Sequence, residues 1–527
     1  MALRDVLDDV TSVDGFTMSF ILGASLIILY WGLFVLRLDA QEPPILKSRI
    51  PVVGHILGML HNSHGYWKTL HDKEPMPACT LPMLNGKMYI INEPSLVSAV
   101  FRARTLSFDP YLFKTIKYMV PISPKAMNVL SSDGFWPRWV KVVYSSMTGT
   151  DLFKMNVVAL GDIFRQINGL PMNMEVEDTS IWLRGMLTTS TVTALLGKDN
   201  PFTKDRGLSA KFWEFERDLA HFVLGPAPWL TSSSAYEARA DMHKALTECN
   251  FSSAAPSAPD VSELARAAIS LQDEHHWSPE DKAALMIGIL QGALANTIPT
   301  FFWFAMHIFS QPSLVAKLRK ELKPLATSGA KLPSGKQEML LDVRAIEDRA
   351  PLLVAAFREN QRAIGVGSIN RWVEADTLLT SPASGRTYLL KKDTPLLIPT
   401  LVNHQDPALW GADAAEYRAE RFLQRDGDGR EFQAGAPVPR GAYTPFGGGK
   451  HLCPGRDFAN AENWGTMIAF LLGFDITTPE GEPLEVPERT MPLPTSGLGR
   501  PVPGSDLRSS VRRRKGWENV VWKVVKA

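Results

Sequence analysis

A glycine-rich loop that ends in a cysteine most constrains what this chain can fold into. The loop runs from Pro445 to Arg456 and places three consecutive glycines, Gly447 to Gly449, shortly before Cys453. Glycine permits a tight turn and lets the backbone approach a planar ligand closely. The stretch from Asp457 to Leu472 reads as a helix, and its positive end together with nearby backbone N–H groups stabilises a thiolate at Cys453. The loop therefore predicts a cysteine that binds a ligand at the start of a helix.

A phosphate-binding loop is the alternative for such a glycine run. That kind of loop ends in Gly-Lys followed by Ser or Thr. Here Lys450 is followed by His451, which excludes it. The three cysteines of the chain, Cys79, Cys249 and Cys453, are odd in number and widely spaced, so they argue against a disulfide framework and favour a reducing compartment.

Phe446, Gly449, Cys453 and Gly455 resemble, at the right spacing, the haem-binding signature of the cytochrome P450 family. The resemblance implies that these residues bind haem b, with Cys453 as the axial ligand of the iron. Thiolate ligation of haem favours cleavage of the O–O bond. His451 is also implied in cofactor binding, but it stands where the family usually has an arginine for a haem propionate. Because histidine is charged only when protonated, we expect weaker pairing there, shared with other basic residues.

Two further motifs fall at the distances expected for the same family. Glu359 to Arg362 is similar to its Glu-x-x-Arg motif, and Ala419 to Phe422 is similar to its Pro-Glu-Arg-Phe segment, with alanine for proline. The resemblance implies a buried network of Glu359, Arg362 and Arg421 behind the haem loop. By itself, an i,i+3 pair is more often a surface salt bridge that contributes little. Upstream, Arg138 and Lys141 are candidates for contact with a propionate, although their spacing departs from the family pattern.

A nearly charge-free stretch from Ala283 to Phe309 predicts a long central helix. Ser278 can cap its start, Pro279 suits its first position, and the two acids that follow complement the helix dipole. The length raises a membrane span as an alternative. Polar residues and a proline interrupt the stretch, so we expect a helix buried in the core of a large protein.

In the family that this chain resembles, the central helix crosses the haem on its oxygen side with a small–Gly–x–acid–Thr pattern. Here Thr297 matches the threonine, but Asn296 replaces the acid and Leu294 the glycine. The resemblance implies that Thr297 and Asn296 are catalytic: Thr297 relays protons, and Asn296, which cannot titrate, orients water or substrate. Pro299 should kink the helix. A buried amide and hydroxyl that bond the backbone are the alternative.

The sequence of this segment resembles a branch of the family that contains sterol 7α-hydroxylases. Prostacyclin synthase, which is an isomerase, is related to that branch. The first hypothesis is a monooxygenase that takes electrons from NADPH through a separate reductase. Its substrate would be a lipophilic small molecule such as a sterol, terpenoid or polyketide, as in fungal secondary metabolite biosynthesis. A reductase-independent isomerase or dehydratase and a non-catalytic haem-binding membrane protein remain alternatives.

The amino-terminal end predicts a membrane anchor. From Phe16 to Leu36 the chain is apolar and uncharged, close to the roughly 20 residues that cross a bilayer as a helix. A cleaved signal peptide would have a basic leader and a shorter apolar run, whereas this leader is acidic. Basic residues after the span place the body in the cytosol, so we expect a single-pass protein of the endoplasmic reticulum. The predicted divisions are a lumenal leader (1–15), an anchor (16–36), a proline-rich elbow (37–54) and a haem-thiolate catalytic domain (55–527).

The remaining patterns predict a mostly α fold with a small β portion, which the resemblance identifies as the cytochrome P450 fold behind an amino-terminal transmembrane helix. Strand-like segments are few: Lys87–Ile91, Tyr388–Ile398 and Val520–Val525. The formal net charge is +1, so bulk electrostatics give no argument for a nucleic-acid partner.

Overall fold

The computed structural model describes most of the chain. The described residues are 22–25, 38–48, 54–83, 86–225, 227–249, 260–425, 431–434, 438–491 and 497–526. The predicted leader and nearly all of the predicted anchor lie outside them, as do residues 49–53 of the predicted elbow. The division into leader, anchor, elbow and catalytic domain therefore stays a prediction.

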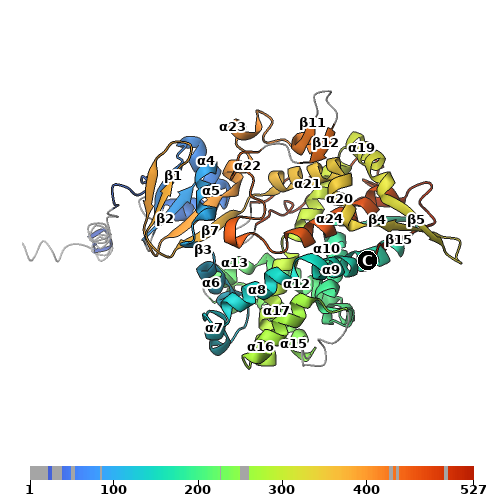
Figure 1. Cartoon of the computed structure of the whole chain (residues 1–527), viewed down its shortest axis with the longest axis horizontal. Helices are drawn as coiled ribbons and strands as arrows, with labels where there is room; N and C mark the ends of the chain where they lie inside the picture. The colour runs from blue at the N-terminus through green and yellow to red at the C-terminus, as the bar shows by residue number, and fades with distance from the viewer. Residues whose placement is uncertain are drawn as a thin grey trace, which may run out of the picture.

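Helices dominate the described chain, as the sequence predicted (Figure 1). In its first half the helices are α3 (Gly54–Asn62), α4 (Gly65–Lys73), α5 (Pro94–Arg102), α6 (Asp109–Met119), α7 (Pro124–Leu130), α8 (Trp136–Ser146), α9 (Gly149–Asn168), α10 (Thr179–Leu196), α11 (Pro201–Lys204), α12 (Gly207–Arg217), α13 (Leu219–Leu224), α14 (Pro228–Thr231) and α15 (Ser233–Glu248). In its second half they are α16 (Glu263–Glu274), α17 (Pro279–Leu294), α18 (Thr297–Phe309), α19 (Pro312–Leu322), α20 (Ile346–Arg349), α21 (Pro351–Ile364), α22 (Thr400–His404), α23 (Pro407–Trp410) and α24 (Arg456–Gly473), with 3-10 turns η2 (Lys323–Leu325), η3 (Val343–Ala345), η4 (Ala419–Phe422) and η5 (Gly449–His451).

The strands form small sheets rather than one large sheet. They are β1 (Ala78–Met83), β2 (Gly86–Ile91), β3 (Leu106–Ser107), β4 (Asn173–Val176), β5 (Ala326–Lys331), β6 (Gln337–Leu341), β7 (Ser368–Val373), β8 (Thr377–Thr380), β9 (Thr387–Leu390), β10 (Pro395–Pro399), β11 (Leu423–Arg425), β12 (Glu431–Ala434), β13 (Phe474–Thr477), β14 (Ser509–Arg513) and β15 (Val520–Val524). The largest sheet has the order β1-β2-β10-β7-β3, in which β10 pairs parallel with β2 and the other neighbours are antiparallel.

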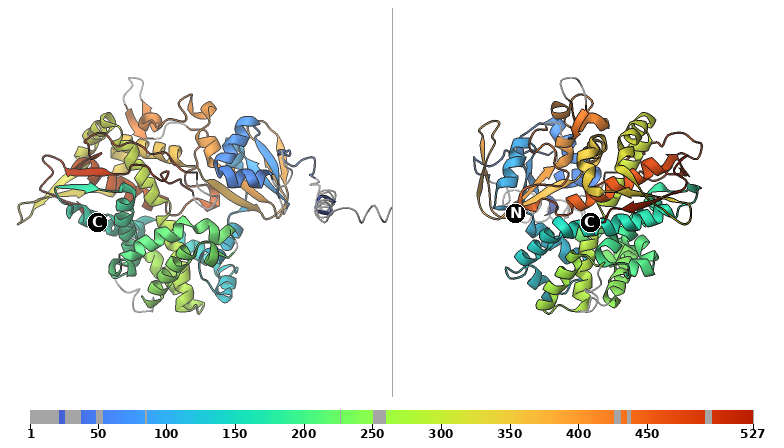
Figure 2. Two further views of the ribbon diagram at one scale, coloured as in Figure 1. Left: turned by 180° about the vertical axis from the view of Figure 1, so that it is seen from behind. Right: turned by 45° about the vertical axis from the view of Figure 1, so that its right-hand side comes forward.

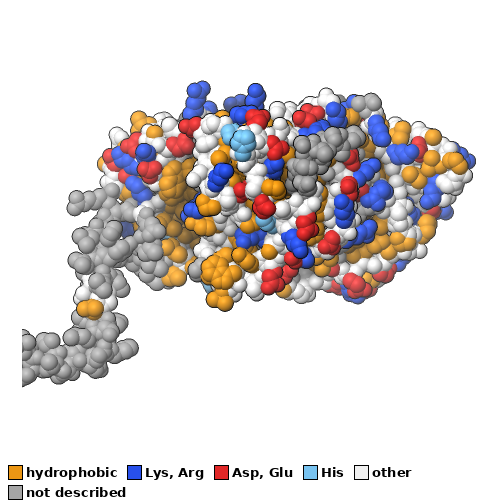
Figure 3. Space-filling view, turned by 90° about the horizontal axis from the view of Figure 1, so that it is seen from below, with side chains coloured by type: hydrophobic (Ala, Val, Ile, Leu, Met, Phe, Trp, Pro, Cys, Tyr) orange, Lys and Arg blue, Asp and Glu red, His pale blue; other side chains and the backbone are white. Residues whose placement is uncertain are grey.

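This five-stranded sheet lies at one end of the molecule, on the left in Figure 1, and the left panel of Figure 2 places the C-terminus toward the opposite end. The predicted strands at Lys87–Ile91 and Val520–Val525 are present as β2 and β15. The predicted segment Tyr388–Ile398 is two strands, β9 and β10, because a turn at Lys391–Thr394 divides it. On the face shown in Figure 3, basic and acidic side chains are interspersed, and hydrophobic side chains gather toward the left.

The main core is built where α9, α10, α18 and α24 pack on one another. The central stretch begins as predicted: Ser278 Oγ accepts a hydrogen bond from the Asp281 N–H, at 3.2 Å, and caps α17. The Asp281 carboxylate in turn accepts bonds from Ser123 at 2.7 and 2.9 Å, which ties the start of α7 to the central helix. Capping therefore fixes both helices at one point.

The central helix is interrupted at Ala295 and Asn296, which divide it into α17 and α18. Pro299 explains the interruption, because it has no N–H to donate to the carbonyl of Ala295. Within the described residues, one helical stretch, Pro279–Phe309, is long and apolar enough to cross a membrane. Most of its large apolar side chains belong to the main core, as expected for a buried helix of a folded body.

Candidate active site

The cysteine loop turns back on itself before α24. The Cys453 N–H donates to the Phe446 carbonyl at 3.0 Å, while Gly447 and Gly449 adopt φ angles of +69° and +66°. A Cβ atom on Gly449 would lie 2.1 Å from the Phe101 carbonyl oxygen at the end of α5. Glycine is therefore required at Gly449 both by its backbone angle and by the close approach of α5.

The Cys453 thiol lies just before the first turn of α24 and is exposed. Nearby protein atoms desolvate the thiolate and so raise the pKa of Cys453. Hydrogen bonds from the N–H groups of Gly455 and Arg456, together with the Arg456 charge, act in the opposite direction. An accessible sulfur with N–H groups directed at it can hold a metal as a thiolate, because the metal replaces the proton.

Tyr144 holds the loop from outside, and His451 fixes it from within. The Tyr144 hydroxyl of α8 donates to the Leu452 carbonyl at 2.6 Å, one residue before the cysteine. His451 Nε2 accepts a hydrogen bond from the Phe108 N–H at 3.1 Å, and its Nδ1 lies 3.7 Å from Asp109 Oδ1. Burial, helped by the charge of Arg371, lowers the pKa of His451 to about 4. The lowered pKa favours the neutral imidazole, which can offer a ligand a hydrogen bond.

Arg371 on β7 is a site candidate that the sequence did not reveal. Its side chain is buried, with 3% exposure, and donates to the carbonyls of Gly448 at 3.0 Å and Asn370 at 2.8 Å. Burial lowers the pKa of this guanidinium to about 10. It makes no ion pair with a carboxylate in the part of the chain that the structure describes. A buried cation beside the cysteine loop that lacks an anionic partner fits a ligand with acidic groups.

Residues of α8 separate into two groups. Trp136 Nε1 is buried and has no hydrogen-bond partner among the described residues, so it offers a second donor for an acidic group. The expectation for Arg138 is wrong, because this side chain points to solvent and pairs with Glu274 at 2.5 Å. Lys141 is also exposed. Both basic side chains lie on the outer face of α8, which the spacing of residues alone could not reveal.

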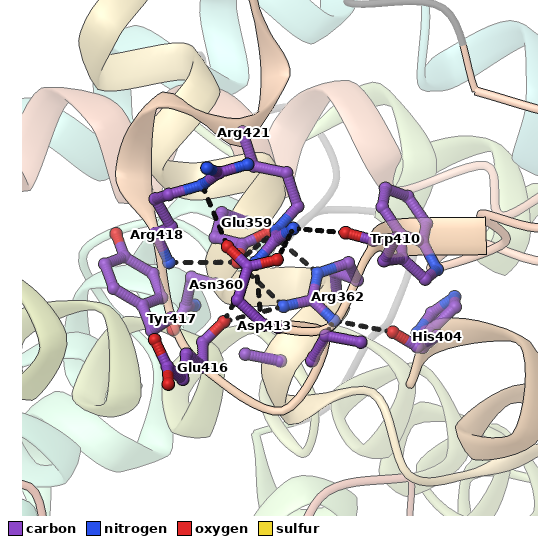
Figure 4. Close-up of polar contacts among 12 residues, drawn as sticks. Glu359, Asn360, Arg362, His404, Trp410, Asp413, Glu416, Tyr417, Arg418 and Arg421 are labelled. Carbon is purple, nitrogen blue, oxygen red and sulfur yellow. Dashed lines mark hydrogen bonds and ion pairs between the residues drawn. The ribbon is translucent and has the colours of Figure 1, made fainter. Parts of the chain in front are cut away.

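The structure brings Glu359, Arg362 and Arg421 together in one buried network (Figure 4). Arg362 makes a two-pronged ion pair with Glu359, at 2.8 and 2.7 Å. Arg421 Nε donates to Glu359 Oε1 at 3.0 Å and its NH1 to Asp413 Oδ1 at 3.1 Å. The two guanidiniums also donate to backbone carbonyls, namely those of His404, Trp410, Asp413, Ala414 and Glu416.

The network is connected to the cysteine loop through His404. Arg362 holds the carbonyl of His404 at 2.6 Å, and Nε2 of the same histidine accepts the Thr444 N–H at 3.1 Å. Burial lowers the pKa of His404 to about 3, so it stays neutral and remains an acceptor. Thr444 comes two residues before Phe446, so the network positions the beginning of the loop.

Asn296 and Thr297 occupy the break in the central helix. Thr297 is buried, whereas Asn296 is exposed although its neighbours along the helix are core residues. Within the described ranges, neither side chain makes a hydrogen bond. The alternative in which both bond the backbone is therefore not what the described structure holds. Gly292, one turn earlier, is also exposed, so α17 is open at this point.

A haem fits the residues present. Cys453 supplies an accessible sulfur, and Arg371 and Trp136 supply buried donors that lack anionic partners, suited to the two acidic side groups of haem. Bound to a thiolate, haem iron activates O₂ and favours cleavage of its O–O bond. The resemblance assigned Phe446, Gly449, His451, Cys453 and Gly455 to the haem, and all of these residues lie on one loop.

Comparison with known proteins agrees with this geometry. A family model described as Cytochrome P450 matches residues 220–503. The chain is 32% identical over 505 residues to a cytochrome P450 monooxygenase of Gibberella zeae, with 95% of this chain and 94% of that protein covered. It is 27% identical over 500 residues to the cytochrome P450 monooxygenase nodJ of Hypoxylon pulicicidum, with 94% of each covered.

The chain is also similar to more distant proteins. Cytochrome P450 7B1 of Mus musculus is 24% identical over 459 residues, with 84% of this chain and 86% of that protein covered. The solved structure of retinoic-acid-bound cyanobacterial CYP120A1 superposes with a TM-score of 0.67 at 18% identity and covers 90% of this chain and 100% of that one. At that identity the structural likeness establishes the fold alone.

Proposed function

Because this chain belongs to the cytochrome P450 family and is a monooxygenase of that family, we propose that it transfers one atom of O₂ to a lipophilic small molecule, with electrons from NADPH delivered by a separate reductase. The observation that carries the proposal is the position of Cys453. Its sulfur is accessible at the end of a loop that three sets of contacts hold: α5, Tyr144 and the Glu359 network.

The roles of the other residues follow from their surroundings. Cys453 holds the iron, while Arg371, Trp136 and His451 hold the rim of the cofactor. The Thr297 hydroxyl has no hydrogen-bond partner among the described residues. It is therefore available to donate a hydrogen bond to a bound ligand and to pass on a proton from water. Asn296 cannot titrate, so it orients that water or the substrate through its amide.

We assign the substrate to the lipophilic compounds that such an apolar helix accommodates. Beside the exposed Gly292, the partly exposed side chains of Ile289 and Ala293 on α17 are apolar. The relatives from Gibberella zeae and Hypoxylon pulicicidum are fungal monooxygenases, which supports a role in secondary metabolite biosynthesis. A sterol, a terpenoid or a polyketide fits this environment.

We place the protein at the endoplasmic reticulum membrane with its catalytic body in the cytosol. The predicted anchor at 16–36 carries this assignment. Near α14, Trp229 and Leu230 are 63% and 78% exposed, and apolar side chains with that exposure favour an interface with a membrane or a partner. The position would also bring the body close to a membrane-bound reductase.

A comparison of metabolites tests the function. Masses are measured in extracts of the native strain and of a strain that lacks this gene. A compound that accumulates and is one oxygen lighter than the lost product supports the monooxygenase and identifies its substrate. An accumulated isomer of the lost product would instead indicate a rearrangement, the alternative reaction that the replacement of the acid by Asn296 allows.

A reconstitution separates the remaining alternatives. The purified protein is incubated with the accumulated compound, with and without NADPH and a cytochrome P450 reductase. We expect product only in the presence of both. Turnover without the reductase would overturn the proposed electron source, and no turnover in either case would indicate a haem-binding protein without this activity.

A further inference from the structure

A short segment of the C-terminal region, residues 497–500, lies against the distal side of the site; we call it the strap. A Cβ atom built on Gly497 would be 3.1 Å from Asn296 Oδ1, and one built on Gly367 would be 3.2 Å from the Gly497 Cα. Trp303 Nε1 on α18 donates to the Gly499 carbonyl at 3.0 Å. The strap therefore limits the space around Asn296.

The strap is joined to α12 by one ion pair. The Arg500 guanidinium pairs with the Glu216 carboxylate, which lies 284 positions away in the chain. The side chain of Glu216 is 8% exposed and that of Arg500 is 30% exposed. Because the carboxylate is buried, breaking this pair without a replacement would leave an uncompensated charge, which is costly. Release of the Arg500 side chain therefore depends on what else Glu216 can pair with.

A second guanidinium lies against α12 one turn before Glu216, because Trp213 and Glu216 are three residues apart on one face of that helix. Arg184 on α10 stacks over the Trp213 ring of α12, with its Cζ 4.8 Å from the ring centroid. It makes no hydrogen bond or ion pair with any residue that the structure describes. Burial lowers the pKa of Arg184, the charge of Arg500 lowers it further, and the charge of Glu216 acts in the opposite direction. The two guanidiniums therefore repel each other, and the charge of the same carboxylate acts on both, although only Arg500 is paired with it.

We propose that Glu216 exchanges between Arg500 and Arg184, so that pairing with Arg500 holds the strap over Asn296 and pairing with Arg184 releases it. Arg184 then lowers the cost of opening, because the carboxylate is never left alone, and the exchange also relieves the repulsion between the two guanidiniums. Glu216, Arg500 and Arg184 are positioning residues that set how readily bulky molecules reach the site. The inference rests on the proposed function, since it takes Asn296 as part of the distal site.

The test measures the entry of a bulky ligand into the haem-loaded, full-length protein. The probe is 4-phenylimidazole, whose binding to haem iron changes the absorption spectrum, and imidazole serves as a small ligand that needs less opening. Association and dissociation rates are followed by stopped flow for Arg500→Gln, Glu216→Gln and Arg184→Met. Methionine keeps a contact with the Trp213 ring but removes the charge.

Removing the charge of Arg500 and removing the charge of Arg184 should change the ligand rates in opposite directions. Arg500→Gln should raise both rates for 4-phenylimidazole by about tenfold, the effect of one charge-assisted hydrogen bond on a rate. Arg184→Met should lower both rates by a similar factor, and Arg184→Lys should restore them. Glu216→Gln should behave as Arg500→Gln does. The rates for imidazole should change little in every variant.

Several outcomes would overturn the exchange. If Arg184→Met and Arg500→Gln shift the rates in the same direction, or if neither changes them, the carboxylate does not move between the two. Arg508→Gln is the matched control, since Arg508 lies beyond the strap, eight residues after Arg500, and pairs with Asp506 and Glu480 at the surface; it should leave the rates unchanged. If Arg500→Gln fails to load haem, Arg500→Met is used, which also removes the charge, and an unaltered rate there equally contradicts the proposal.

The absorption spectrum of the reduced protein with carbon monoxide distinguishes failure of the proposed function from failure of the Glu216 exchange. A native protein that gives no thiolate-type carbonyl spectrum would refute the proposed function. A native protein with that spectrum, but with ligand rates that do not respond to Arg184 or Arg500, would refute the exchange alone.

Discussion

The proximal and distal sides of the site are held in opposite ways. On the proximal side, Glu359 accepts hydrogen bonds from two buried guanidiniums, and their remaining donors reach backbone carbonyls around the loop. On the distal side, Asn296 and Thr297 make no side-chain hydrogen bond to any described residue. The proximal side, which carries the metal ligand, is fixed by more hydrogen bonds than one contact would need. The distal side keeps its polar side-chain atoms available for a ligand.

The difference shows how one fold combines a fixed metal ligand with a variable chemistry. A loop with many internal contacts tolerates little change, because each lost contact leaves a buried polar atom without a partner. A helix break whose side chains make no hydrogen bond to a described residue can change those residues at a small cost in stability. We therefore expect stability to depend mainly on the proximal side and reaction type on the distal side.

Removing the metal ligand should have the largest effect. In Cys453→Ser the hydroxyl cannot supply a thiolate, so we expect complete loss of the thiolate-type carbonyl spectrum and of product formation. Circular dichroism should still report a helical fold. Cys249→Ser serves as the control and should retain both the spectrum and activity. A carbonyl spectrum that persists in Cys453→Ser would place the iron ligand elsewhere.

Breaking the proximal network should have the next largest effect. Glu359→Gln leaves the buried Arg362 without a carboxylate and leaves Arg421 with Asp413 alone, so we expect the free energy of unfolding to fall by about 3–5 kcal/mol. Urea denaturation measures it. The matched control is Glu347→Gln, whose pair with Arg358 is surface-exposed and should contribute about 0–1 kcal/mol. If both variants lowered the free energy of unfolding equally, the buried network would contribute no more to stability than a surface ion pair.

One buried carboxyl sharpens the comparison, because it lies on the proximal side yet is poorly satisfied. Glu462 on α24 accepts a hydrogen bond from Thr191 at 2.6 Å, but its second oxygen has no partner among the described residues. Burial raises the pKa of Glu462 from 4.5 to about 7. The neutral form is thus favoured in the folded state, and its contribution to stability is present below pH 4.5 and lost as pH rises through 7.

The variant Glu462→Gln cannot ionise, so it should not lose this stability at higher pH. We expect it to be more stable than the native protein by about 3 kcal/mol at pH 8, and the advantage should shrink as pH falls toward 5. Urea denaturation across this range, compared with Glu480→Gln at the surface, measures the effect. A constant difference at all pH values would show that the carboxyl is ionised in the folded protein.

The smallest effect on stability is expected at the distal side. Thr297→Val has a similar volume and breaks no described hydrogen bond, so the free energy of unfolding should change by less than about 1 kcal/mol. Product formed per NADPH consumed should fall by about tenfold, the effect of one lost hydrogen bond on a rate. Thr297→Ser should restore it. A large loss of stability in Thr297→Val would show that the hydroxyl is structural.

Sequence patterns predicted those parts of the site that depend on neighbouring residues. The helical character, the start of α17 at Ser278 and the interruption near Pro299 all follow from local rules of capping and backbone geometry. The joining of Glu359 and Arg362 with Arg421 followed from the family resemblance, since the spacing alone fitted a surface pair equally well. The structure explains why these three are buried: the carbonyls that surround them come from a loop between α22 and η4.

Residues placed by tertiary packing could not be predicted. Arg371 sits in an ordinary strand, and only the pairing of β7 next to the cysteine loop makes it a buried cation without a carboxylate. Arg138 was a candidate for contact with a propionate, but it lies on the outer face of α8 and pairs with Glu274, whereas Trp136 Nε1 is buried. The strap is likewise invisible in the sequence, since Glu216 and Arg500 meet only in the folded chain.

The order of the five-stranded sheet has a consequence for how the protein is made. Strands β1 and β2 leave the ribosome early, but β10, which pairs with β2 through Leu396 and Leu397, is synthesised some three hundred residues later. The Cys453 loop, which packs on α5 next to that sheet, follows later still. The edge of β2 that faces β10 must therefore wait unpaired until most of the chain exists, and an unpaired strand edge is a place where another chain can add.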